Sequence, residues 1–149
     1  QRKDVLVYTT AALSEDVEIT GPISATLYAS SSAPDTDFTV TLVDVAPDGS
    51  THLVQEGIIR ASFRDGVDLR SPIEPDKVYE YVLDLWATSH VVKAGHRLRV
   101  EVSSSNFDRS DRKPNTGRDF GLSAETVPAT QTIYHSAEHP SRITLPVIP

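Results

Sequence analysis

Hydrophobic and polar residues alternate with a period of two along much of this chain. In HRLRVEV, Leu98, Val100 and Val102 fall on one face, and charged residues occupy the other. Because successive side chains of a strand point to opposite faces, this pattern predicts half-buried antiparallel strands. We predict further strands in DVLVYTT, VEIT, ISATLYAS, DFTVTLVDV, GIIRASF, YEYVLDLW, ATQTIYH and RITLPV.

Turn formers separate these segments. Pro47-Asp48-Gly49 predicts a hairpin turn, Gly21-Pro22 a break between two strands, and Lys93-Ala94-Gly95 the turn before HRLRVEV. No segment has the helical period over about ten residues. An all-β chain of about nine short strands is typical of a two-sheet sandwich, either a jelly roll or an immunoglobulin-like arrangement. We expect one such domain over residues 1–149.

Composition narrows the classes of function. The net charge of −7 and the pI of about 5.1 argue against nucleic acid as the main partner. No apolar run approaches the roughly 18 residues of a membrane span, so no membrane partner is expected. The absence of cysteine excludes disulfides and thiol catalysis; it fits the cytoplasm, although a secreted domain can also lack cysteine. Because the chain contains no methionine, we expect it to be a fragment of a longer protein.

Short catalytic and metal motifs are present but lack their structural context. His135-Ser-Ala-Glu138-His139 matches the H-x-x-E-H pattern of zinc peptidases, yet it follows a strand signal and Pro140 leaves no room for the required helix. Ser110-Asp-Arg-Lys113 fits S-x-x-K without its partner motifs. No G-x-S-x-G occurs, so we expect no catalytic residue, metal or cofactor in this chain.

Asp35 and Asp37 could contribute to a calcium site, since oxygen ligands suit that ion. Two carboxylates make an incomplete site, however. We therefore favour an Asx-type turn that leads into the strand DFTVTLVDV.

The stretch SSSNFDRSDRKPNTGRDFG, residues 103–121, is the most unusual part of the chain. Connections in compact domains usually run about 4–6 residues, and longer ones tend to be functional or disordered. Its Asn, Pro and Gly residues fix turns, and its mixed charges can form local ion pairs, so the composition favours a structured loop. We expect Phe107 to anchor the loop to the sandwich.

Several segments together resemble a known family. DVLVYTT, DVEITGPISATLYASSSAPDTDFTVTLVDVAPDGS, SSSNFDRSDRKPNTG and HSAEHPSRITLPVI are similar to the C-terminal domain of the CocE/NonD hydrolases, a group related to X-Pro dipeptidyl-peptidases, cocaine esterase and alpha-amino-acid ester hydrolases. The resemblance runs along essentially the whole chain. Within the loop, Lys113 stands where the family commonly has asparagine.

The resemblance implies an all-β, jelly-roll sandwich like that of galactose-binding domains. It implies a parent serine hydrolase whose Ser-His-Asp triad lies in a separate α/β-hydrolase domain, and this chain would be its inactive C-terminal module. The alternative is a carbohydrate-binding β-sandwich module, and a homo-oligomer is possible in either case.

We expect the module to pack against the α/β-hydrolase domain and to help shape its substrate pocket. The contacts would come from the 103–121 loop and from a loop around Trp86, Ser89 and His90, because Trp, Phe and Arg are enriched where protein surfaces meet. The candidate interface residues are Trp86, His90, Asn106, Phe107, Arg109, Asp111, Arg112 and Asn115.

Overall fold

Two antiparallel sheets make up the fold of this chain. The computed structural model describes residues 3–118 and 124–149. Within these residues lie nine strands and one short 3-10 helix: β1 (Leu6–Thr9), β2 (Val17–Ser31), β3 (Asp37–Val45), β4 (Thr51–Arg60), η1 (Ala61–Phe63), β5 (Tyr79–Val92), β6 (Arg97–Ser103), β7 (Gln131–Ile133), β8 (Arg142–Thr144) and β9 (Val147–Ile148).

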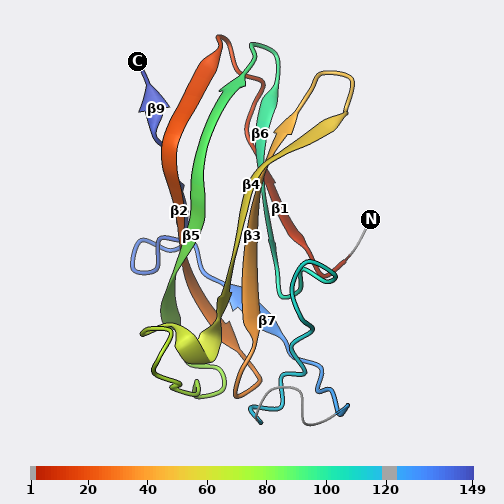
Figure 1. Cartoon of the computed structure of the whole chain (residues 1–149), viewed down its shortest axis with the longest axis vertical. Coiled ribbons are helices and arrows are strands. Elements are labelled where there is room, and N and C mark those ends of the chain that lie inside the picture. The colour runs from red at the N-terminus through yellow and green to blue at the C-terminus, as the bar shows by residue number, and fades with distance from the viewer. Residues whose placement is uncertain (1–2, 119–123) are drawn as a thin grey trace.

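The strands form two layers (Figure 1). One sheet has the order β1-β6-β3-β4, and the other has the order β5-β2-β7, with β8 and β9 also pairing with β2. The predicted all-β sandwich is confirmed. Its jelly-roll connectivity and its likeness to galactose-binding domains stay predictions.

Two predicted interruptions are wrong. Gly21-Pro22 does not end a strand, since β2 runs from Val17 to Ser31 with only a register shift between Pro22 and Ser24. A proline can sit at such an irregularity because the ladder hydrogen bond is already lost there. The expected loop around Trp86, Ser89 and His90 is likewise part of a strand, β5.

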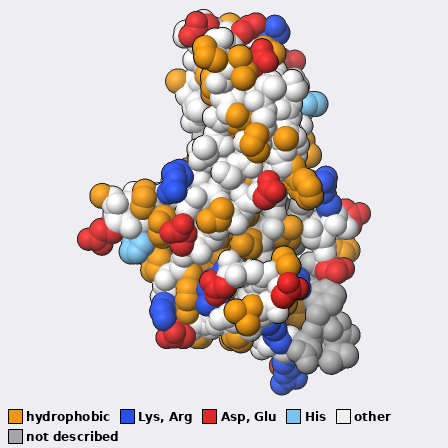
Figure 2. All heavy atoms as spheres, turned by 60° about the vertical axis from the view of Figure 1, so that its left-hand side comes forward, with side chains coloured by type: hydrophobic (Ala, Val, Ile, Leu, Met, Phe, Trp, Pro, Cys, Tyr) orange, Lys and Arg blue, Asp and Glu red, His pale blue; other side chains and the backbone are white. Residues whose placement is uncertain are grey.

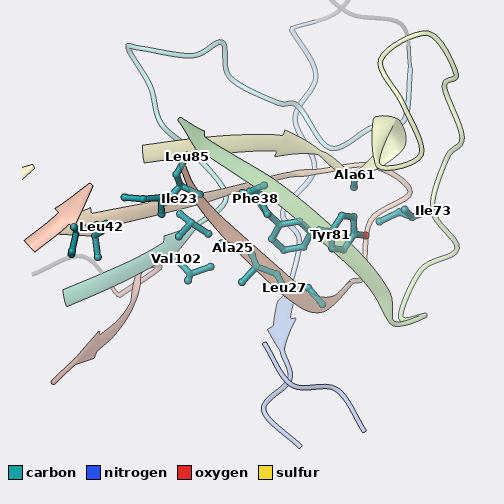
Figure 3. Packing of buried hydrophobic residues seen from close by; sticks show 14 of the residues in the cluster. Ile23, Ala25, Leu27, Phe38, Leu42, Ala61, Ile73, Tyr81, Leu85 and Val102 are labelled. Atoms are coloured by element: carbon teal, nitrogen blue, oxygen red, sulfur yellow. The ribbon is translucent and has the colours of Figure 1, made fainter. Parts of the chain in front are cut away.

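The core lies between the two sheets and is built from the predicted inward positions. Ile23, Ala25 and Leu27 of β2 face Phe38 and Leu42 of β3, and all five are buried (Figure 3). From β5, the residues Tyr81, Leu83 and Leu85 add to the same cluster. Each fully buried side chain of this size contributes roughly 1.5–3 kcal/mol relative to leaving it exposed. The period-two pattern therefore identifies the residues that hold the sheets together.

The sandwich is closed along one side and open along the other. On the closed side, Gly57 of β4 lies so near β5 that a Cβ at this position would be 2.5 Å from the carbonyl oxygen of Asp84. On the open side, β1 forms the edge of its sheet, and an apolar cavity of about 190 Å³ lies between the sheets, lined in part by Tyr8, Val100 and Ile133.

The structure also bears on membrane association. Throughout residues 3–118 and 124–149, no helix has the length and apolar character needed to cross a membrane.

Candidate domain interface

The loop that follows β6 crosses the solvent-facing side of β4 and is fastened there by Glu56. The Asn106 amide donates to Glu56 Oε2 at 2.9 Å, and the Arg109 guanidinium pairs with the other carboxylate oxygen. Glu56 is nearly buried by these contacts. One strand carboxylate thus fixes the first part of the loop at two points.

A second fastening point lies further along the loop. Lys113 Nζ is 2.6 Å from Asp35 Oδ2, and both side chains are almost fully buried. Asp35 also accepts hydrogen bonds from the Ser62 N–H at 3.0 Å and the Ser62 hydroxyl at 2.8 Å. Asp35 therefore ties together the turn before β3, the helix η1 and the loop.

These contacts bear on the two readings of Asp35 and Asp37, a partial calcium site or the favoured Asx-type turn. Asp37 pairs with Arg60 through two hydrogen bonds of 2.9 and 3.2 Å, so each aspartate already has its own cation. Burial raises the pKa of Asp37, although Arg60 acts in the opposite direction. Among the described residues, no group of three or more His, Asp or Glu side chains is arranged to hold a metal ion. Asp35 accepts from the N–H of Thr36 and from Ser62, rather than closing a simple Asx turn.

Beside the fastened loop lies an exposed area of mixed apolar and polar side chains that we call the Trp86 surface. It consists of Ile58, Val82, Trp86, Asn106 and Arg109, which line a shallow pocket of about 300 Å³. Trp86 is 70% exposed. Its backbone has a φ of 64°, and its N–H donates to Asp84 Oδ1 at 2.7 Å. The strand irregularity thus holds a large aromatic ring outward at the rim of the loop.

Hydrophobic and charged side chains are both present on the face of the molecule that Figure 2 draws. Figure 2, in which the side that carries β2 and β5 comes forward, shows hydrophobic side chains interspersed along the molecule and charged ones gathered mainly toward its wider end. The Trp86 surface differs from the rest of the molecular surface because it has a pocket and a fixed loop beside it. Its apolar side chains alone do not set it apart.

Phe107 does not anchor the loop to the sandwich, so that expectation is wrong. Its ring is 64% exposed and stacks under the Arg112 guanidinium, 4.9 Å from the ring centroid. The polar and charged side chains of Asn106, Arg109 and Lys113 hold the loop instead. Phe107 and Arg112 are therefore directed toward solvent and are free to contact another surface.

The remaining three candidate residues lie in three places. Asp111, within the loop, lines a shallow pocket together with Arg60 and Asp37. Asn115 closes the base of the loop, since its amide donates to the Val127 carbonyl at 3.1 Å. His90 lies apart from the Trp86 surface and belongs to a different cluster, centred on Asp44.

Asp44 links the two sheets. His90 Nε2 from β5 lies 2.9 Å from one oxygen of its carboxylate, and His96 Nδ1 lies 2.7 Å from the other. The ring of His52 stacks on His90 at 5.3 Å. Burial acts to raise the pKa of Asp44, but the hydrogen bonds from the two histidines outweigh it and hold that pKa below its usual value. His90 therefore has a structural partner inside the domain.

The H-x-x-E-H motif does not form a zinc site. His135 and Pro140 form an isolated bridge, so the motif is a tight turn. His135 Nε2 lies 2.9 Å from the Tyr8 hydroxyl, whereas the His139 ring packs on Tyr28 at 5.5 Å. The two imidazole rings thus contact different residues, in agreement with the sequence prediction that this motif is not a zinc site.

Sequence reasoning did not identify Glu56, Lys113 or Val82 as parts of the site. The two fastening contacts join segments far apart in the chain, and no local pattern reveals them. Val82 did carry a signal, because it shares the polar face of YEYVLDLW with Trp86 and is exposed in the structure. Val82 and Trp86 are thus two large apolar residues on the solvent side of one strand.

The chain is similar to several known proteins. Residues 1–144 match the family of the X-Pro dipeptidyl-peptidase C-terminal non-catalytic domain. The chain is 46% identical to cocaine esterase of Rhodococcus sp. (strain MB1 Bresler), a match that covers 99% of this chain and 26% of that protein.

Two solved structures are also similar. An alpha-amino acid ester hydrolase superposes with a TM-score of 0.93 at 33% identity, covering 99% of this chain and 26% of the other. An aminopeptidase from a marine sediment archaeon, Thaumarchaeota archaeon, superposes with a TM-score of 0.89 at 35% identity, covering 100% of this chain and 26% of the other. The chain thus spans about a quarter of the length of these relatives.

Proposed function

Because the chain belongs to the family of X-Pro dipeptidyl-peptidase C-terminal non-catalytic domains, we propose that it is one accessory domain, over residues 1–149, of a longer serine hydrolase of the CocE/NonD type. It packs on the α/β-hydrolase domain of that protein and helps to shape the substrate pocket. The parent cleaves an ester or an amide, a proposal that rests on relatives described as a cocaine esterase, an alpha-amino acid ester hydrolase and an aminopeptidase.

The observation that carries the packing proposal is the Trp86 surface. Exposed tryptophans are enriched among the residues that dominate binding energy at protein interfaces. Here the ring projects from a strand beside a loop that two buried carboxylate contacts hold in place. A partner therefore meets a surface whose shape is already set, which lowers the entropy lost on docking. Phe107 and Arg112, which lie against each other in the same loop, offer a further exposed pair of side chains to a partner.

The test is docking to the hydrolase part of the parent, expressed separately. We expect calorimetric titration to give saturable binding by the native chain and at least a tenfold weaker affinity for Trp86→Ala, since a central hot spot contributes about 2 kcal/mol or more. Leu69→Ala is the matched control, because Leu69 is also strongly exposed but lies on the connection between η1 and β5. Equal affinities for the native chain and Trp86→Ala, or no binding at all, would refute the proposal.

Hydrolysis assays with the same samples separate this role from catalysis. We expect the chain alone to leave a chromogenic ester and an X-Pro anilide intact, and to raise the activity or stability of the hydrolase part after mixing. Turnover by the isolated chain, abolished by a serine-directed inhibitor, would show a catalytic site within these residues.

A carbohydrate-binding module is the second candidate. An exposed tryptophan bordered by hydrogen-bonding side chains, here Asn106 and Arg109, is also suited to a sugar ring. A glycan array distinguishes the two functions: retention of a glycan by the native chain but not by Trp86→Ala would favour the sugar-binding role.

A further inference from the structure

The open side of the sandwich has a slot that is formed by two cavities. One cavity, of about 190 Å³, is lined in part by Val100, and the other, of about 320 Å³, is lined in part by Ser104. Val102 and Ile133 belong to the walls of both cavities, so the two adjoin. The residues of the Trp86 surface line neither of them. The slot is therefore a separate feature of the fold.

The smaller cavity, which we call the tail part of the slot, is mainly apolar. Its walls contain aliphatic side chains from both sheets: Ala25, Leu27, Val40, Val100, Val102, Ile133 and Ile143. In another protein, an engineered apolar cavity of about 150 Å³ stays dry and binds benzene, because water finds no hydrogen-bond partners there. By that measure, the volume of the tail part suits an alkyl chain of about six to eight carbons.

The polar groups in the wall of the tail part already have partners within the protein. The Tyr8 hydroxyl lies 2.9 Å from His135 Nε2, and this contact joins β1 to the segment that follows β7. The Ser141 hydroxyl accepts from the Tyr28 N–H at 2.9 Å, and the Arg142 guanidinium donates to a nearby backbone carbonyl at 3.3 Å. An alkyl chain can therefore fill the tail part without taking hydrogen bonds away from these groups.

The larger cavity, which we call the head part, has a mixed wall that includes residues 103–105, all serine, and Gln131. Gln131 Nε2 donates to Thr36 Oγ1 at 2.7 Å, whereas the buried Gln131 Oε1 has no hydrogen-bond partner among the described residues. A ligand hydroxyl can donate to such an oxygen and can also accept from a serine. Lys3 and Asp4, in the same wall, carry opposite charges. The head part thus favours an uncharged ligand group with hydroxyls.

We propose that the slot binds an amphiphile with a medium-length alkyl chain and an uncharged head group that carries hydroxyls. The alkyl chain lies in the tail part, between Leu27 of one sheet and Val100 of the other. The head group lies in the head part, beside the serines and Gln131. Binding buries the alkyl chain against aliphatic side chains and supplies a donor for the unpaired amide oxygen, and both changes favour the complex.

Calorimetric titration of the full 149-residue chain with 1-O-octylglycerol, below its micellar concentration, tests the proposal. We expect saturable binding of one ligand per chain, and an affinity at least about tenfold weaker for Val100→Phe, whose larger side chain fills the tail part. Val54→Phe is the matched control: Val54 is also partly buried against the core but lines neither cavity. Absence of saturable binding, or a well-folded Val100→Phe variant with the native affinity, would overturn the proposal.

The choice of ligand tests the two parts of the slot separately. Glycerol, which lacks the alkyl chain, should give no saturable binding. Octanoate should bind at least about tenfold more weakly than 1-O-octylglycerol, because a carboxylate cannot donate to Gln131 Oε1. Equal affinities for octanoate and 1-O-octylglycerol would contradict the uncharged head group.

Nuclear Overhauser effects on the native chain locate the ligand without any substitution. At saturation, the terminal methyl group of 1-O-octylglycerol should show contacts with the methyl groups of Leu27, Val100 and Ile143. Contacts with Val82 and Ile58 instead would place the ligand on the Trp86 surface and would refute the slot as its site. These measurements use this chain alone, so they are independent of docking to a hydrolase domain.

Discussion

Lys113 and Asp35 form an ion pair of 2.6 Å whose two side chains are 4% and 0% exposed. The lysine comes from the long loop and the aspartate from the turn before β3. Water is excluded from both, so the pair differs from the surface ion pairs elsewhere on the molecule. The path of the loop depends on this contact more than on any exposed charge within it.

Replacing the lysine tests that dependence. We expect Lys113→Ala to lower the free energy of unfolding by about 3–5 kcal/mol, because removing one partner leaves a buried carboxylate without its cation. Denaturant unfolding measures this change. Lys77→Ala is the control, since the exposed Lys77–Glu74 pair contributes at most about 1 kcal/mol. A loss below about 1 kcal/mol for Lys113→Ala would show that the pair does not hold the loop.

The first fastening point can be tested by proteolysis. Glu56→Gln keeps the shape of the side chain but removes the charge that pairs with Arg109. We expect faster tryptic cleavage after Arg109 and Arg112, because the first part of the loop is then held more weakly, with little change in global stability. Glu74→Gln, in the exposed pair with Lys77, should leave cleavage at these sites unchanged. Equal cleavage rates for Glu56→Gln and the native chain would contradict the assignment.

The contacts of Asp44 with His90 and His96 predict that the stability of the fold depends on pH in the acidic range. The folded-state pKa of Asp44 lies below its unfolded value of about 3.9, so its contribution is present above that pH and is lost as the pH falls through the folded pKa. The free energy of unfolding of the native chain should fall as the pH is lowered from about 5 to about 2, and we expect this decrease to be smaller in Asp44→Asn.

Unfolding curves measured across this pH range provide the comparison. Asp16→Asn is the control. In the native chain the pKa of Asp16 is also lowered, first by its hydrogen bond with Lys93, but this carboxylate is exposed. Solvent screens that pair, so its effect on the slope should be smaller. A slope for Asp44→Asn equal to that of the native chain would argue against a role of the two histidines in holding the carboxylate ionised.

Gly57 tests the closed side of the sandwich. A Cβ at this position would meet the carbonyl oxygen of Asp84 at 2.5 Å, so β5 must shift to accept Gly57→Ala. We expect a loss of roughly 1–3 kcal/mol in the free energy of unfolding, as for other overpacked positions. Leu53→Ala, at an exposed position of the same strand, should change stability by about 0.5 kcal/mol or less. A Gly57→Ala variant as stable as the native chain would mean that the two strands are free to separate.

The alternation of residue types predicts the core well because it is a local property. Leu98, Val100 and Val102 identify the inner face of β6 from a few consecutive residues. The predicted break at Gly21-Pro22 is wrong because the same local signal fits a turn and a strand irregularity, and only the pairing with β5 decides between them. The position of Trp86 in a strand depends on that same long-range pairing.

The candidate site could be predicted only in part. Asn106, Arg109 and Trp86 do meet, as the expected interface requires. His90 does not join them, and the sequence does not show that Asp44 lies within reach of its ring. The apolar character of Phe107 suggests an anchoring role, but the loop is held by ion pairs with Glu56 and Asp35, which lie on a strand and a turn far away in the sequence.

The two fastening points also limit how this loop can be transplanted. The donors Asn106, Arg109 and Lys113 lie in the loop, while the acceptors Glu56 and Asp35 lie in the framework. A graft of the loop alone onto a sandwich with no acidic residue at the position of Asp35 would carry a lysine into a buried site without its carboxylate. A successful graft must move Asp35 and Glu56 together with the loop, whereas Phe107 and Arg112 can be varied to suit a new partner.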